Sequence, residues 1–451
     1  MSLLTEAAPA LETLAAANRK LGSAYPGDRP TRQPVHTVYG GAQLYKAETT
    51  TRLGELALKS LETYASTPAE LAAAVGLLPA LRSDAVLIET VFERVKAKLQ
   101  REAVEDFRID FEDGFGARSD VEEDAEAVRA AGELARGMRE GVLPPFIGIR
   151  IKSFSEEWSV RGARTLELFI DALLAASGGV LPENFVITLP KVMIPEQPRA
   201  LLRLLELLET RHGLAAGSLK FELMVETTQA LIGPDGYCPL PALLAACAGR
   251  CVGAHLGTYD FTASCNITAA HQTMNHPICD LAKGLMLLSF AGTGVFLSDG
   301  ATNVMPVGPH RGKDLSPVQL AENRALVHAA WQLSHRHIRH SLAGGYYQGW
   351  DLHPAQLPVR YAACYAFFLE GLPSAAERLQ NFIAKAAQAS LVGGVFDDAA
   401  SGQGLLNYFL RALNCGAIEL RDMEQTGLTA AEVELRSFAK ILAARRARLG
   451  G

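Results

Sequence analysis

The sequence contains no block of basic residues. Its 43 Lys and Arg are scattered among 49 Asp and Glu, which gives a formal net charge of -6. Nucleic acids and anionic membrane surfaces attract clustered Lys and Arg, so a dispersed and slightly acidic charge distribution argues against both. We expect no nucleic acid and no membrane among the main partners of this chain.

A membrane-spanning run is also missing. The longest stretch without a charged residue or His is 284–298, which has Gly292 and Gly294 in its interior. It is shorter than the roughly 20 apolar residues that a transmembrane helix needs. Residues 1–21 are rich in alanine but carry four charged side chains, so they predict an amphipathic helix rather than a signal peptide. We therefore expect a soluble, cytoplasmic protein.

The cysteines form no CxxC pair, and their number, seven, is odd. Most lie in apolar or helical segments, as expected for reduced core residues of a cytoplasmic protein. Cys247 and Cys251 are four residues apart and could share a metal on one helix face, but no second Cys or His pair at zinc-site spacing accompanies them. A structural zinc site is not expected.

Short apolar runs alternate with longer amphipathic segments along the chain. Eight runs predict strands, at residues 35–40, 107–111, 146–151, 185–192, 219–226, 255–262, 294–299 and 346–351. Their starts are 34 to 72 residues apart, which leaves room for a helix and two loops each time. This alternation predicts a parallel sheet, and eight units predict closure into a (β/α)₈ TIM barrel. An open doubly wound sheet is the alternative, but it needs a Gly-rich phosphate turn after the first strand, and Gly40-Gly41 matches that poorly.

The rest of the chain divides around this barrel. We expect an N-terminal helical extension at 1–34, the barrel domain at 35–358 and a C-terminal helical lid region at 359–451. A Gly pair interrupts the C-terminal region and is followed by Asp397 and Asp398. A flexible pair before two acids is how a hinged lid with a catalytic group is built.

The working groups of TIM barrels lie at the carboxyl ends of the strands. Polar residues at these predicted ends are Glu112, Asp113, Arg150, Lys152, Lys191, Glu226, Asp260, Asp299 and His353. Glu226 and Asp260 each stop an apolar run, and two such carboxylates suit a hard divalent cation, Mg²⁺ or alternatively Mn²⁺. The competing interpretation is that both only cap the helices that follow; as a pair on neighbouring strands they favour the metal.

The other polar groups suggest a site for a small acid. Arg150 can hold a substrate carboxylate through two parallel hydrogen bonds. Glu112 and Asp113 would orient Arg150 or a metal-bound water, or would simply favour a helix N-terminus. Lys191 could form a Schiff base, but an electrostatic role fits better beside a metal pair. His353 either touches substrate or only fixes the last strand.

Six motifs carry a resemblance to a known family. Asp110-Phe111-Glu112-Asp113, Arg150-Ile151-Lys152-Ser153, Leu189-Pro190-Lys191-Val192 and Val225-Glu226-Thr227 resemble motifs of the citrate lyase beta subunit family, within the phosphoenolpyruvate/pyruvate superfamily. Residues 257–264 and 349–356 are similar to segments of malyl-coenzyme A lyases. The motifs follow in order over about residues 35–410.

This resemblance implies a Mg²⁺-dependent barrel that makes or breaks carbon–carbon bonds next to a carbonyl, through an enolate. It implies Glu226 and Asp260 as metal ligands and Arg150 as the carboxylate clamp. Residues 396–401 also resemble the stretch with the catalytic aspartate of malate synthases, which makes Asp398 the acid–base candidate and Asp397 the next. Because related barrels form trimers or hexamers, a homo-oligomer is expected.

Together these observations predict a lyase or synthase that acts on a small keto or hydroxy acid, or on its coenzyme A thioester. A class II pyruvate-type aldolase that uses the same metal without a thioester is the first alternative. The second is a binding or assembly protein without catalysis, since a barrel does not fix function.

Overall fold

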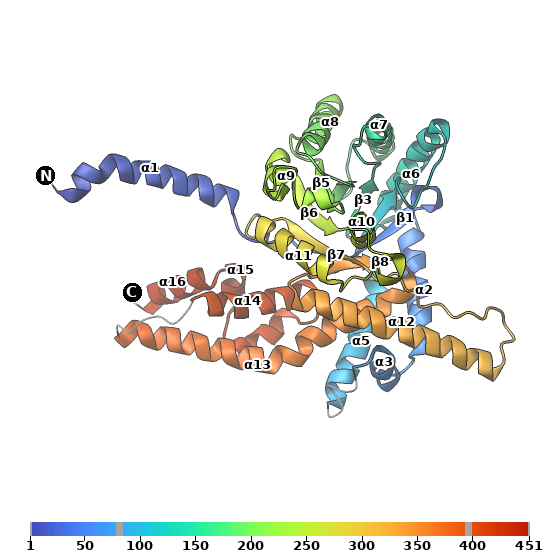
Figure 1. Ribbon diagram of the computed structural model, residues 1–451. Coiled ribbons are helices and arrows are strands. Elements are labelled where there is room, and N and C mark those ends of the chain that lie inside the picture. Colours follow the sequence, from blue (N-terminus) through green and yellow to red (C-terminus); the bar gives the residue numbers. More distant parts are fainter. Residues whose placement is uncertain (1, 78–83, 393–398, 450–451) are drawn as a thin grey trace.

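The computed structural model describes residues 2–77, 84–392 and 399–449 (Figure 1). Eight parallel strands close into a barrel in sequence order, with β8 paired to β1. The strands are β1 His36–Gly41, β2 Asp106–Asp110, β3 Phe146–Arg150, β4 Phe185–Leu189, β5 Lys220–Val225, β6 Cys251–Leu256, β7 Phe296–Ala301 and β8 Gln348–Asp351. The predicted (β/α)₈ barrel is confirmed.

Helices precede, surround and follow the barrel. The α-helices are α1 Leu3–Ala24, α2 Thr49–Tyr64, α3 Pro68–Val75, α5 Ala85–Glu102, α6 Asp120–Glu140, α7 Ser159–Ser177, α8 Glu196–His212, α9 Leu240–Ala246, α10 Thr258–Ser264, α11 Pro277–Phe290, α12 Pro317–Ala343, α13 Leu357–Val392, α14 Ala399–Asn414, α15 Ala430–Glu434 and α16 Phe438–Leu449. Short 3₁₀ helices are η1 Ala42–Leu44, η2 Thr228–Ala230, η3 Ala269–His271, η4 Pro354–Gln356 and η5 Leu420–Thr426.

Helix α6 shows how local sequence sets these elements. Ser119 accepts a hydrogen bond from the backbone N–H of Glu122, and the Glu122 carboxylate accepts one from the backbone N–H of Ser119. Ser119 with a glutamate three residues later has the spacing of a capping box, so the sequence predicts these two hydrogen bonds. The helix ends at Gly141, whose φ of 67° is the left-handed conformation that glycine adopts readily. Between these ends, Leu134 is fully buried in the core.

The interior of the barrel is polar, although the sequence suggests mostly apolar strands. Alternate residues of β2 point inward, so Arg108 reaches across to β5 and pairs with Glu222 at 2.8 Å, and it also pairs with Asp106. Nε2 of His255 lies 3.1 Å from Glu222, while Nδ1 accepts a hydrogen bond from the indole of Trp350. Buried charges need such partners. Here the contacts among these side chains link β2, β5, β6 and β8 below the site.

Two predicted elements are wrong in their bounds. Strand β6 ends at Leu256, and Thr258–Ser264 form α10, so the run predicted at 255–262 is mostly helix. The sequence also predicts a final helix over 429–449, which is broken into α15 and α16 because Arg436 adopts a left-handed φ of 50°. Helix α13 packs on α5 and α12, α14 and α16 pack on α13, and α1 projects away from the body (Figure 1). Within the described ranges, the helices are all too short or too polar to cross a bilayer.

Candidate active site

Six of the polar residues predicted at strand ends come together at the carboxyl end of the barrel. Arg150 is the last residue of β3, Glu226 directly follows β5, and the others lie in the loops and the short helix after β2, β4 and β6. The six are Glu112, Asp113, Arg150, Lys191, Glu226 and Asp260, and ion pairs, a backbone hydrogen bond and close charges connect them. This end is where parallel barrels carry their active sites.

Arg150 is almost completely buried and held by a residue that the sequence reasoning missed. Its Nε and Nη2 donate to Asp110 at 2.7 and 2.6 Å, so the two parallel bonds expected for a substrate carboxylate are made to Asp110. Nη1 lies 3.1 Å from Oε2 of Glu112. The guanidinium also lies 4.9 Å from the ring of Tyr39 and 6.0 Å from that of Trp350. Asp110 could have been found from its inward position in β2, two residues after Arg108.

Lys191 places a positive charge at the centre of the cluster. Its Nζ lies 2.7 Å from Oε1 of Glu112, 3.2 Å from Oδ2 of Asp260 and 3.7 Å from Oδ1 of Asp113. Burial alone would lower the pKa of Lys191, but the charges of Glu226 and Glu112 raise it above its usual range. The backbone there is left-handed, with a φ of 51°, a strained conformation typical of functional sites. A lysine that stays protonated fits an electrostatic role rather than a Schiff base.

Glu226 is buried, with 2% of its surface exposed. Burial raises its pKa to about 8, helped by the negative charges of Glu112 and Asp260 and opposed by Lys191. Oε1 accepts the backbone N–H of Lys191 at 2.7 Å. Gly257 lies against this side chain so closely that a Cβ there would overlap the carboxylate. Gly257 is therefore the residue that makes room for Glu226.

Asp260 belongs to the cluster, but it lies on a different element from the predicted one. It lies in the first turn of α10 instead of ending a strand, as the competing capping interpretation had it. The short turn at Gly257 nevertheless brings its carboxylate to Lys191. Glu226 and Asp260 thus both contact Lys191 from two adjacent strand–helix connections, Glu226 at the backbone N–H and Asp260 at the ammonium.

The charge balance of the cluster suits a divalent cation. Asp110, Glu112, Asp113, Glu226 and Asp260 contribute five carboxylates, whereas Arg150 and Lys191 contribute two positive charges, which leaves a formal excess of three negative charges. Carboxylate oxygens are the ligands that Mg²⁺ and Mn²⁺ prefer. Among the described residues, no three His, Cys, Asp or Glu side chains are already grouped as a metal site. Instead, the ammonium of Lys191 lies among the carboxylates. Their oxygens fit a divalent cation that would bind beside the ammonium or take its place.

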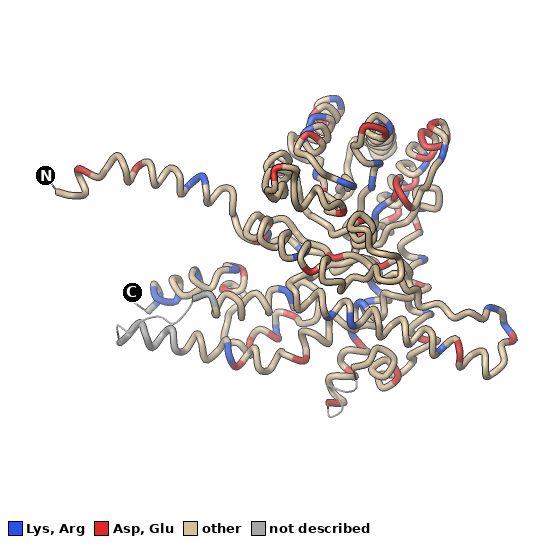
Figure 2. Tube along the Cα trace, in the orientation of Figure 1, with Lys and Arg blue, Asp and Glu red and all other residues tan. Residues whose placement is uncertain are grey.

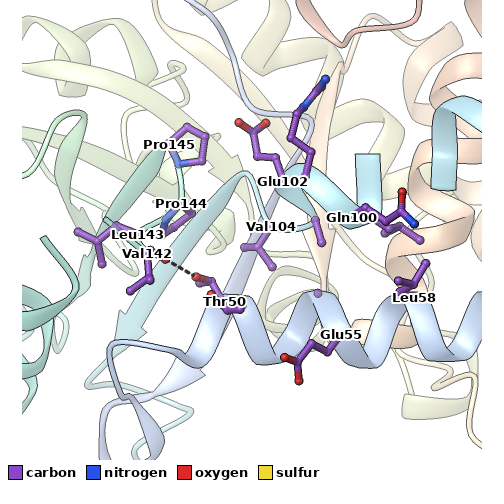
Figure 3. Close-up of a pocket in the computed structure, with 15 residues that line it drawn as sticks. Thr50, Glu55, Leu58, Gln100, Glu102, Val104, Val142, Leu143, Pro144 and Pro145 are labelled. Carbon is purple, nitrogen blue, oxygen red and sulfur yellow. Dashed lines mark hydrogen bonds between the residues drawn. The ribbon is translucent and has the colours of Figure 1, made fainter. Parts of the chain in front are cut away.

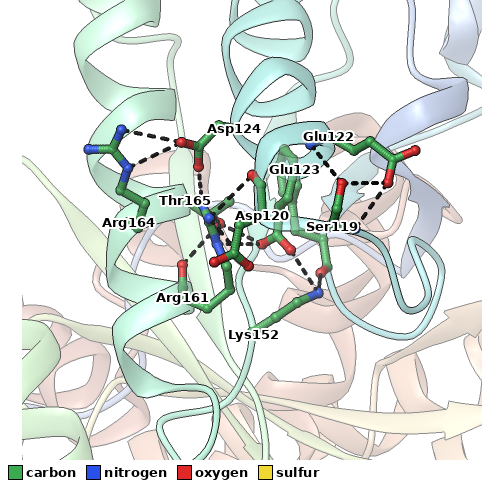
Figure 4. Close-up of polar contacts among 10 residues, drawn as sticks. Ser119, Asp120, Glu122, Glu123, Asp124, Lys152, Arg161, Arg164 and Thr165 are labelled. Atoms are coloured by element: carbon green, nitrogen blue, oxygen red, sulfur yellow. Dashed lines mark hydrogen bonds and ion pairs between the residues drawn. The ribbon is translucent and has the colours of Figure 1, made fainter.

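Lys152 belongs to the support of the site. Its Nζ donates to the carbonyl of Phe111 at 2.8 Å and lies 3.2 Å from Glu123 of α6. Figure 4 shows that Glu123 also accepts from Thr165 and pairs with Arg161, both on α7. This buried network ties the loops after β2 and β3 to two helices, so it holds the segments that carry Arg150 and its acidic neighbours.

The remaining predicted residues lie elsewhere. Asp299 is inside β7 and is buried against Lys283 and Ser341, so it does not face the cluster. His353 accepts the backbone N–H of Ala355 and caps η4. Its part in substrate binding stays a prediction. Asp397 and Asp398 lie outside the described residues.

Two of the hollows in the described part of the chain lie at opposite ends of the barrel. One, of about 410 Å³, opens beside the cluster and is lined by Glu112, Lys191, Ser153 and Trp158, among others. The other, of about 480 Å³, lies among α2, α5 and the segments that precede β2 and β3, at the opposite end of the barrel (Figure 3). Its partly buried carboxylate, Glu102, already pairs with two basic side chains. We therefore place the candidate active site at the first hollow.

The fold and this acidic site define a TIM-barrel protein with an enzyme-like cluster at the carboxyl end of its strands. A family model described as a domain of unknown function, DUF6986, matches residues 14–441. The chain belongs to that family. No curated protein sequence matches it.

Several solved structures are similar in fold. A citrate lyase from Burkholderia xenovorans LB400 is 19% identical, with a TM-score of 0.50 over 88% of this chain and 97% of that one. A Haloferax volcanii malate synthase in a magnesium/glyoxylate complex is 14% identical, with a TM-score of 0.47 over 74% of this chain and 76% of that one. Protein CitE from Mycobacterium tuberculosis, with magnesium and acetate, is 15% identical, with a TM-score of 0.37 over 74% of this chain and 90% of that one. The likeness to the citrate lyase shows a shared fold, and the two weaker ones add nothing to it.

Proposed function

We propose that this protein is a divalent-cation-dependent carbon–carbon lyase or synthase that acts on a small keto or hydroxy acid. The observation that carries the proposal is the convergence of Asp260 and Glu112 on the ammonium of Lys191, with Glu226 bound to the backbone N–H of Lys191 and Arg150 beside them. The similarity in fold to a protein described as a citrate lyase supports it. The motifs that resemble the citrate lyase beta subunit family fall on these same residues.

Glu226 and Asp260 would hold Mg²⁺ or Mn²⁺, and Glu112 and Asp113 would orient Arg150 or water on the ion. When bound, such an ion stabilises negative charge on a carbonyl oxygen and so favours an enolate. The excess of carboxylates supports this role, because a bound cation would offset both the burial and the charges of Glu112 and Asp260, which together raise the pKa of Glu226. The metal, its ligands and the acid substrate are all part of the proposal.

The protein's own groups would position the acid and exclude water. Arg150 is fixed by Asp110 and presents Nη1 toward the cluster, where it can donate to a substrate carboxylate. Lys191 keeps its proton and can donate to a developing oxyanion from the side of Glu112. Asp398, with Asp397 next to it, is the proposed acid–base residue by resemblance alone. A homo-oligomer and a thioester substrate likewise remain proposals.

To test the proposal, the purified protein is incubated with Mn²⁺ or Mg²⁺, glyoxylate and either acetyl-coenzyme A or pyruvate. The condensation product is then measured. Product with acetyl-coenzyme A supports the thioester reaction, and product with pyruvate alone supports the class II aldolase. The Glu226→Gln variant should lose both turnover and metal binding, because it removes a buried ligand charge. Glu196→Gln, an exposed acid at the start of α8, is the matched control and should change neither. A protein that binds no divalent ion and condenses nothing would be the non-catalytic scaffold instead.

A further inference from the structure

The hollow beside the acidic cluster has more room than the smallest keto acids need. Its volume is about 410 Å³, which is in the range of sites that enclose ligands much larger than glyoxylate or pyruvate. The reacting end of a substrate would lie at the end formed by Glu112 and Lys191, so the rest of the hollow is free to hold the other end of the molecule. The residues that line this rest are Gly116, Ala117, Arg118, Lys152, Ser153 and Trp158.

Arg118 is held in a fixed orientation in the wall of this hollow. Its Nε donates to the backbone carbonyl of Phe115 at 3.1 Å, and its guanidinium lies 4.8 Å from the centre of the Phe115 ring. Phe115 is itself buried and packs against Phe111, with 5.8 Å between the ring centres. Because the guanidinium is fixed at one nitrogen and on one face, it loses little further freedom when a ligand binds.

The two terminal nitrogens of Arg118 are unused. Figure 2 shows acids and bases interspersed along the chain, and Arg150, for example, is paired with Asp110. Arg118, in contrast, has no carboxylate within ion-pair distance among the residues that the structure describes. The backbone N–H and the hydroxyl of Ser119 lower the pKa of the nearby Glu122, and the charge of Arg118 adds to this effect. The Glu122 carboxylate is thus bound by Ser119 and leaves the terminal nitrogens of Arg118 free.

The other large side chains of this part of the hollow offer no unused charge. The ammonium of Lys152 is bound to the carbonyl of Phe111 and to Glu123. Trp158, at the start of α7, is 39% exposed, and its ring lies 5.6 Å from this ammonium. Among the described residues that line the hollow away from the cluster, Arg118 is therefore the charged group with donors to spare.

The unused edge of Arg118 indicates what the far end of the substrate carries. Its two terminal nitrogens present parallel N–H groups, and a carboxylate is the group that binds such a pair with two hydrogen bonds. We infer, on the basis of the proposed function, that Arg118 binds a second, distal carboxylate, so that the substrate is a dicarboxylic keto or hydroxy acid. Trp158 then packs against the carbon chain between the two acid groups.

Titration calorimetry at saturating Mn²⁺ tests this inference with two acids. These are α-ketoglutarate and α-ketovalerate, which has a methyl group in place of the distal carboxylate. The natural chain should bind α-ketoglutarate at least about tenfold more tightly. Arg118→Met should abolish the preference by weakening α-ketoglutarate alone, and Arg118→Lys, which keeps the charge without the parallel N–H groups, should retain only part of it. Arg19→Met, an exposed arginine of α1, is the matched control and should keep the full preference.

A substitution of the opposite kind separates the carboxylate from the carbon chain. Trp158→Ala should weaken both acids by a similar factor, because it removes a contact that they share. A loss confined to α-ketoglutarate in Trp158→Ala would place the distal carboxylate at that wall and overturn the role of Arg118. Since Arg118 is exposed, its variants keep a folded barrel, which circular dichroism verifies.

The inference and the proposed function fail in different ways. Equal affinities for the two acids in the natural chain, or a preference that persists in Arg118→Met, would overturn the inference while Mn²⁺ binding keeps the proposed metal site. A natural chain that binds no Mn²⁺ would overturn the proposed function, and the inference with it.

Discussion

The ammonium nitrogen of Lys191 lies 3.2 Å from Oδ2 of Asp260. Since Glu112 accepts from the same nitrogen at 2.7 Å, a positive charge already stands where acids from three strand ends converge. The protein thus neutralises part of its acidic cluster with its own side chain, and the proposed cation would complete the neutralisation.

Removing this internal charge should tighten metal binding. In Lys191→Met the carboxylates keep their positions but lose a neighbouring positive charge, so the dissociation constant for Mn²⁺ should fall at least about fivefold. Titration calorimetry measures it. Lys220→Met, in β5 and away from the cluster, is the control and should change it little. Equal or weaker Mn²⁺ binding by Lys191→Met would mean that the ammonium does not compete with a cation.

Gly257 should be required for the position of Glu226. A methyl group in Gly257→Ala would overlap the Glu226 carboxylate and displace it, so Mn²⁺ affinity should fall at least about tenfold without general unfolding. Gly284→Ala in α11, where a Cβ meets nothing within 4 Å, is the matched control. Normal Mn²⁺ affinity in Gly257→Ala would show that Glu226 is not a ligand.

Asp110 should matter for stability as well as for the site. Asp110→Ala leaves the buried guanidinium of Arg150 without its main partner, which should cost roughly 3–5 kcal/mol of unfolding free energy. Denaturant unfolding measures this loss. Asp171→Ala, a half-exposed acid that pairs with Arg211 on the helical surface, should cost under about 1 kcal/mol. Similar losses in the two variants would refute the anchoring role of Asp110.

Asp351 should contribute acid-sensitive stability. Burial alone would raise its pKa, but Arg360 and His36 lower it to about 2. A folded pKa below the unfolded value stabilises the protein above about pH 4, and this contribution disappears as the pH falls toward 2. The stability gap between the natural chain and Asp351→Asn should therefore narrow by about 2 kcal/mol between pH 5 and pH 2. A gap that stays constant over this range would show that Asp351 is not held in its charged form.

The barrel was predictable because its signal is local. Each strand is a short apolar run and each spacer is long enough for a helix, so composition and spacing were sufficient. The capping box of Ser119 and Glu122 was found in the same way. The predicted bounds of a strand were wrong where a turn has no strong local signal in the sequence. This is the case at Gly257, between β6 and α10.

The site was predictable only in part, since its geometry depends on contacts between distant segments. Carboxylates and bases at strand ends were identified individually, but the partner of Arg150 lies 40 residues away in β2. The rings of Tyr39 and Trp350, which lie beside the guanidinium of Arg150, come from the first and last strands of the barrel. Asp299 was wrongly expected at the site, because an acid inside a strand that faces a covering helix looks the same in sequence as an acid at a strand end that faces the site.

The most direct test is a crystal structure with Mn²⁺, using its anomalous scattering to locate the ion. The account predicts one strong peak bound by both Glu226 and Asp260, at about 2.0–2.3 Å from their oxygens, with the ammonium of Lys191 moved away from Asp260. A peak that involves neither carboxylate, or Lys191 still between the acids at saturating Mn²⁺, would contradict it.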